Sequence, residues 1–102
     1  MEHLAKGLKR KYIALVEAVS AAINKADPIR LLATGAPPDE YDPEVGTIVP
    51  RLKAAHGIDD VQRIIHEEFS RWFDDIAGPA DAYGQAAIDV WRALQEFRRQ
   101  AG

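Results

Sequence analysis

The residues best able to do chemistry in this sequence are four acids in one short segment. The segment holds no base, and its acids are Asp39, Glu40, Asp42 and Glu44. Carboxylates can bind a divalent cation, but a calcium loop needs acids at positions one, three and five and a glutamate at twelve, and this spacing differs. Three interpretations stay open: a cation site, a solvated loop that caps a helix, and a surface for a protein partner.

Two of these acids also have structural roles open to them. Asp42 precedes Pro43 and is expected to be the N-cap of a helix, and Glu44 would complement the positive end of that helix. Tyr41 either docks onto the core or anchors an interface. The primary candidates for contact with a protein partner are Asp39, Glu40, Tyr41, Asp42 and Glu44. We expect no metal and no cofactor.

A second acidic patch lies among aromatic residues in segment 67–75. Its amphipathic pattern predicts a helix whose aromatic side chains face inward and whose acids face outward. These acids are the secondary contact candidates: Glu67, Glu68, Asp74 and Asp75. If they share a face with the loop, the two patches form one acidic surface. Such a surface favours a basic partner, because complementary charge speeds and orients association.

Residue types and spacing indicate no catalytic site. His66-Glu67 begins the zinc-protease pattern, but the second histidine of that pattern is replaced by Ser70. Neither Ser20 nor Ser70 lies in the glycine-flanked turn of a serine nucleophile. The lack of cysteine excludes thiolate metal sites and a cysteine nucleophile. We therefore expect a protein that is not an enzyme.

Length and composition indicate one globular domain over residues 1–102, of which 47% are hydrophobic. The net charge of −3 is too small to favour nucleic acid. No apolar run is long enough to span a membrane, and the N-terminal segment lacks the apolar core of an export signal, so we expect a cytoplasmic protein. Charge is uneven: residues 1–30 carry six bases and three acids, whereas residues 31–60 carry two and six.

Apolar residues spaced by three and four predict helices along most of the chain. The expected main helices run from about His3 to Ala26, from Asp42-Pro43 to His56, from Asp59 to Gly78, and from Ala80 to Gln100. A short helix, Ile29–Thr34, should begin at Asp27-Pro28. Pro50 should kink or locally break the second main helix near Gly46–Val49, and Asp59 with Gln62 should form a capping box. The predicted fold is an all-α, compact antiparallel bundle of four main helices plus one short helix.

The apolar stripe of the third main helix is expected to form the centre of the core, because it is the most hydrophobic. It consists of Val61, Ile64, Ile65, Phe69, Trp72, Phe73 and Ile76. The first and last helices contribute narrower stripes, which include Tyr12 and Phe97.

One longer pattern resembles a known family. It consists of Asp27-Pro28, Gly35-Ala36-Pro37, Asp39-Glu40-Tyr41-Asp42-Pro43 and the later Phe69…Trp72-Phe73. Together these segments resemble the small bacterial family of unknown function typified by the YugE-type proteins, over about residues 10–78. The resemblance implies a compact all-helical domain with no established activity. Some proteins that look like this family act as immunity proteins, which neutralise toxin domains delivered by neighbouring bacteria.

The leading hypothesis is therefore a non-enzymatic immunity-type module that binds a basic toxin domain, such as a nuclease. Under this hypothesis we expect the module to have no nucleic-acid or membrane partner. The alternative is a helical housekeeping or regulatory domain without a toxin partner, dimeric if Trp91 or Phe97 is exposed. A metal-dependent enzyme built on the acidic loop is the third hypothesis.

Overall fold

The protein is described by a computed structural model that covers the backbone of residues 2–101 and the side chains of residue 7 and residues 9–100. All regular elements in this range are helical, so the predicted all-α fold is confirmed. They are α1 (Glu2–Ala26), α2 (Asp42–Ile48), the 3-10 helix η1 (Val49–Ala54), α3 (Ile58–Phe73), the 3-10 helices η2 (Asp74–Ala77) and η3 (Ala80–Tyr83), and α4 (Gly84–Ala101).

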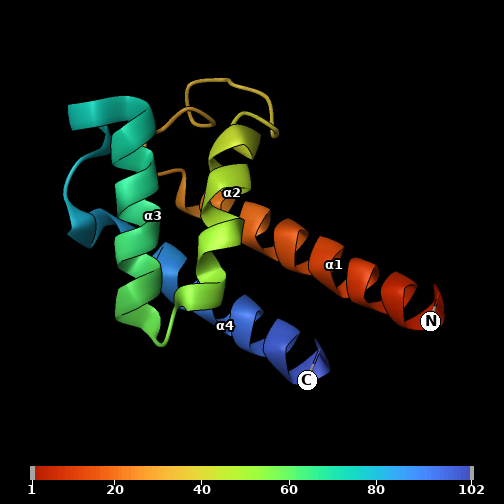
Figure 1. Ribbon diagram of the computed structural model, residues 1–102. Coiled ribbons are helices and arrows are strands. Elements are labelled where there is room, and N and C mark those ends of the chain that lie inside the picture. Colours follow the sequence, from red (N-terminus) through yellow and green to blue (C-terminus); the bar gives the residue numbers. More distant parts are fainter. Residues whose placement is uncertain (1, 102) are drawn as a thin grey trace.

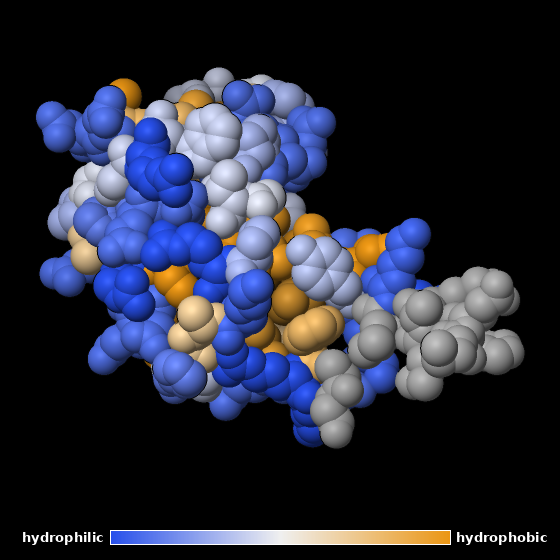
Figure 2. Space-filling view, in the orientation of Figure 1, coloured by the Kyte–Doolittle hydropathy of each residue, from blue (hydrophilic) through white to orange (hydrophobic). Residues whose placement is uncertain are grey.

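The helices form two antiparallel pairs that cross. α1 and α4 lie side by side and run in opposite directions, while α2 and α3 form a second pair across them (Figure 1). Hydrophilic side chains cover most of the face in Figure 2, and apolar side chains come to the surface in a hollow beside α1. The start of α1 and the end of α4 lie on one side of the molecule, away from the connection between α1 and α2 (Figure 1).

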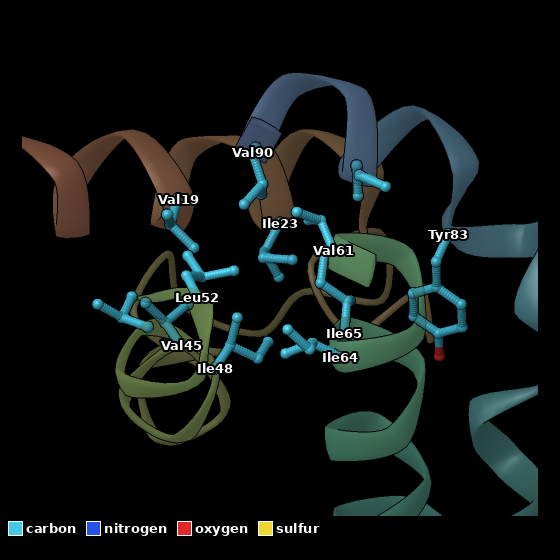
Figure 3. Close-up of a cluster of buried hydrophobic side chains, with 14 of the residues drawn as sticks. Val19, Ile23, Val45, Ile48, Leu52, Val61, Ile64, Ile65, Tyr83 and Val90 are labelled. Carbon is cyan, nitrogen blue, oxygen red and sulfur yellow. The ribbon is translucent and has the colours of Figure 1, made fainter. Parts of the chain in front are cut away.

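The core lies where the two pairs cross. Val19 and Ile23 of α1 and Val90 of α4 point toward the residues of α2, η1 and α3 (Figure 3). Those facing residues include Val45, Ile48, Leu52, Val61, Ile64 and Ile65, all of them buried. Burying an aliphatic side chain stabilises a fold by roughly 1.5–3 kcal/mol, so this central layer dominates the stability.

The connection after α1 differs from the prediction. Residues 28–35 form hydrogen-bonded turns, so the predicted short helix Ile29–Thr34 is wrong. Asp27 and Arg30 adopt positive φ angles of 44° and 66°, which a right-handed helix does not allow. Asp27 therefore does not cap a helix with its neighbour Pro28, and its side chain closes the turns instead.

The Asp27 carboxylate joins three parts of the chain. It accepts hydrogen bonds from the amides of Leu32 (3.0 Å) and Ala33 (2.9 Å) and from the Tyr41 hydroxyl (2.6 Å). The Tyr41 oxygen in turn accepts a bond from the Leu31 amide at 3.3 Å. Burial works to raise the pKa of Asp27, but the hydrogen bonds to its charged form lower it overall. Burial and the bond to Asp27 raise the pKa of Tyr41 to about 12.

The predicted break at Pro50 is confirmed. α2 ends at Ile48, and the chain continues as the 3-10 helix η1 from Val49. Proline has no amide hydrogen and its ring crowds the preceding turn, so the α-helical pattern cannot pass through it. The change of helix type keeps the apolar side on the core, with Val49 and Leu52 both buried.

Four helix ends differ from their predicted positions, and one of them is the start of α4, which lies at Gly84 after η3 rather than at Ala80. The N-cap of α2 is Tyr41, so Asp42 is the first helical residue. The N-cap of α3 is Gly57, and Asp60 reaches back to accept a 2.8 Å bond from the His56 amide, which replaces the capping box expected at Asp59. α3 ends at Phe73, because Asp74 has a φ of 50°.

The apolar stripe of α3 is only partly buried. Val61, Ile65 and Phe69 are fully buried, as predicted, but Trp72 is 48% exposed and Ile76 is 72% exposed. Ile76 lies beyond the last α-helical residue, in η2, so the helical spacing no longer fixes its direction.

The variant Asp27→Asn should be less stable at neutral pH by about 1.5–3 kcal/mol, the usual range for hydrogen bonds to a charged group. The folded-state pKa of Asp27 lies below its ordinary value of 3.8. This contribution is therefore present above that value and lost as pH falls through the folded-state pKa. Urea unfolding at several pH values should show the deficit of the variant shrinking in acid.

Asp59→Asn is the matched control, because Asp59 is exposed at the start of α3. Its stability should stay within about 0.5 kcal/mol of the parent protein. Equal losses in the two variants would contradict the role assigned to Asp27.

Candidate protein-binding surface

The structure brings part of each predicted acidic patch to one end of the molecule, but Glu67, in the middle of α3, is not among these residues. α2 begins where α3 ends, because the two helices are antiparallel, and the connection from α1 reaches the same end (Figure 1). We call the exposed acids at this end the acidic end. They are Asp39, Glu40, Asp42, Asp74 and Asp75. None of the ion pairs among the described side chains involves these five residues.

Tyr41 is not available to a partner. Its side chain is fully buried, and its ring lies 5.7 Å from that of Phe69 on α3, centre to centre. Of the two roles open to Tyr41 in the sequence, docking onto the core is the one found. Its loss as a contact residue is a correction to the predicted site.

Glu68 is a second correction, because it faces inward rather than outward. It is only 2% exposed, and its carboxylate bonds to Arg51 at 2.8 Å and to Arg71 at 3.2 Å. Burial works to raise its pKa, but hydrogen bonding by Thr47 and Arg51 and the charge of Arg71 lower it overall. Glu67 is half-exposed and pairs with Arg51 at 2.6 Å, so one guanidinium of η1 joins two acids of α3.

Glu44 is a third correction. It is only 4% exposed, and its Oε2 atom has no hydrogen-bond partner among the described residues. Burial raises its pKa, and the nearby charges of Glu40 and Asp42 raise it further. Glu44 therefore makes the electrostatic potential at the acidic end more negative when it is charged. It offers no surface that a partner could touch.

Two exposed apolar residues that the sequence placed in the core lie beside these acids. The Trp72 indole nitrogen lies 3.3 Å from the Thr47 hydroxyl and donates a hydrogen bond to it, so one edge of the ring rests on α2. Ile76 follows Asp74 and Asp75 directly and is 72% exposed. Aromatic and large aliphatic side chains that can lose contact with water on binding supply most of the energy of protein interfaces.

The histidines and acids whose side chains the structure describes do not gather into a metal site. No group of three or more histidine, aspartate or glutamate side chains in the described part of the chain could hold a metal ion. His66 has a structural environment, because its Nε2 lies 2.9 Å from the carbonyl of Gly78 and its ring lies 5.5 Å from Tyr83. This arrangement holds η2 and η3 against α3.

Glu44 and Glu68 are equally buried but should respond oppositely to replacement by glutamine. Glu44→Gln should raise the free energy of unfolding at neutral pH by about 1 kcal/mol, because it removes a buried charge that lacks a full set of partners. Glu68→Gln should lower it by about 2 kcal/mol, because Arg51 and Arg71 lose their shared anion. Denaturant unfolding monitored by circular dichroism measures both changes.

The pH dependence of the two effects also differs. The raised pKa of Glu44 means that its protonated form stabilises the fold below the ordinary value of 4.5 and that this contribution is lost as pH rises. The gain in Glu44→Gln should therefore vanish in acid. The lowered pKa of Glu68 means that its charged form stabilises the fold. This stabilisation is present above pH 4.5 and is lost as the pH falls through the folded-state pKa. Changes of the same sign in both variants would contradict this interpretation.

Comparisons with protein-family models, curated proteins and solved structures found no match for this chain. They leave the resemblance to the YugE-type family, and the partner it implies, as predictions. Within residues 2–101, no helix is both long and apolar enough to cross a membrane.

Proposed function

We propose that this protein is a non-enzymatic binding module whose acidic end binds a basic protein. The observation that carries the proposal is the exposure of Trp72 and Ile76, at 48% and 72%, on either side of the exposed Asp74 and Asp75 in the sequence. An apolar centre with a charged rim is the usual anatomy of a protein interface. The proposed partner is a toxin domain such as a nuclease, and the module would act as its immunity protein.

The acids and the apolar residues would play different parts in binding. Exposed carboxylates attract a basic surface from a distance, so they raise the association rate, and this effect weakens as salt screens the charges. Trp72 and Ile76 would lose contact with water only in the complex, so they slow dissociation. A nuclease suits this division, because its nucleic-acid site is already basic.

The fold also supports a preformed surface. Trp72 is positioned by its bond to Thr47 of α2, and Arg51 joins η1 to α3 through Glu67 and Glu68. Side chains held in place before binding lose less conformational entropy when the complex forms. An inhibitor that must cover a toxin needs this rigidity and needs no catalytic group.

The test is binding to the toxin-like product of the gene directly upstream, measured by surface plasmon resonance, and protection of cells that express it. Trp72→Ala should weaken the affinity at least tenfold, mainly through faster dissociation. Replacing both Asp74 and Asp75 by Asn should slow association and reduce its dependence on salt.

The chain offers matched controls at the opposite end of α3. Ile58 is 39% exposed there, so Ile58→Ser controls for Ile76→Ser, and Asp59→Asn controls for the aspartate variants. The control changes should leave binding unchanged, whereas Ile76→Ser should weaken it severalfold. No binding at micromolar concentration, together with no protection of cells, would overturn the proposal.

A further inference from the structure

A groove lies between α1, η1 and α4, on the side of the molecule away from the acidic end. It has a volume of about 390 Å³. Its apolar lining includes Tyr12 and Leu15 of α1, Val49 and Leu52 of η1, and Leu94 and Phe97 of α4. The hollow of apolar side chains beside α1 in Figure 2 belongs to this region.

The walls of the groove are tied to one another. Lys11 donates a 2.6 Å hydrogen bond to the carbonyl of Gln100, and the rings of Tyr12 and Phe97 meet edge to face at 6.4 Å. These contacts fix the spacing of α1 and α4 next to the groove. The groove is therefore present before any ligand binds.

Arg98 fixes the third wall. Its guanidinium donates hydrogen bonds to the carbonyls of Leu52 at 3.3 Å and Ala55 at 2.9 Å, and it also lies 5.8 Å from the centre of the Trp91 ring. These bonds reach carbonyls at and just after the end of η1, one of which, that of Leu52, also accepts from the Ala55 amide. Arg98 thus holds η1 against α4 and keeps the floor of the groove in place.

Apolar surface continues beyond the groove along α1. Tyr12 is 45% exposed and Ile13 is 46% exposed, so two large side chains next to each other remain in water. Tyr12 lines the groove, so its exposed ring extends the apolar lining onto the surface of α1, whereas Ile13 points about 100° away around the helix; we call the lining with Tyr12 the apolar strip. A partner that covers such a strip gains free energy in proportion to the apolar area removed from water.

The charges beside this strip are mainly basic. Lys53 lines the groove, and Lys9 and Arg10 are exposed one helical turn before Tyr12 and Ile13. Glu96 is the nearest acid along α4, and it is already paired with Arg99 and Gln100. A two-fold dimer through this face would oppose basic residues with basic residues. Nucleic acid would match the charge but leave the apolar floor unused.

We propose that this groove is a second binding site, which takes the apolar side of an acidic amphipathic helix from a partner protein. Apolar residues spaced by three and four on such a helix would fill the floor, and its flanking acids would face Lys9, Arg10 and Lys53. The site is distinct from the acidic end and requires a partner of opposite charge to the one proposed there.

The test uses a synthetic helix of about four turns with leucines on one side and glutamates on the others. Titration into ¹⁵N-labelled protein should shift the amide resonances of η1 and of the facing turns of α1 and α4. Tyr12→Ser should weaken binding about tenfold, and Lys53→Glu severalfold. Ile58→Ser, an exposed isoleucine outside the groove, should leave affinity unchanged and serves as the matched control.

Further probes separate the competing occupants. A peptide of the same composition in scrambled order should not bind, because its leucines no longer share one side. Equal binding by the scrambled peptide, or resonance shifts confined to other surfaces, would overturn the proposal. It would also be overturned if decanoate or a DNA duplex bound the groove while the helical peptide did not. A concentration-dependent dimer in sedimentation that Tyr12→Ser dissociates would assign the groove to a second copy of the chain instead.

Discussion

The fold depends on the Asp27 carboxylate and its bond to the Tyr41 hydroxyl. α1 ends at Ala26, and the chain reverses through two residues with positive φ, a conformation that costs of order 1 kcal/mol each for residues other than glycine. Three hydrogen bonds to one carboxylate offset this cost. Tyr41 also packs on Phe69, so the same interaction sets where α2 begins with respect to both α1 and α3.

The crossing of the two helix pairs explains where apolar side chains reach the surface. Each pair covers the other only near the crossing, so the ends of the long helices extend past the core (Figure 1). Trp72 lies in the last turn of α3, and Tyr12 lies in the part of α1 that leads away from the core. Trp72 and Tyr12 lie on the same side of their helices as the core residues, but beyond the crossing no second helix pair covers them completely. The geometry thus leaves one apolar site at each end, one beside acids and the other beside bases.

Local patterns carry much of the fold and much less of the site. The spacing of Val61, Ile64 and Ile65 predicts their burial, and Pro50 predicts a break in the α-helix, because both effects act within a turn or two. Asp27-Pro28 has the local pattern of a helix start, but the Asp27 carboxylate instead accepts a hydrogen bond from the hydroxyl of Tyr41, which local sequence does not indicate. No local pattern shows that Arg51 would draw Glu68 inward, or that the core would end before Trp72.

The buried Glu44 connects the stability of the fold to the proposed use of the acidic end. Glu40 and Asp42 lie close enough to raise its pKa further, so the carboxylates at this end repel one another. Like charges held close together destabilise the fold that contains them. A basic partner would offset that repulsion, because cations placed over Glu40 and Asp42 would also stabilise the charge on Glu44. The arrangement that weakens the free protein would therefore favour the proposed complex, in which a partner's cations lie over these carboxylates.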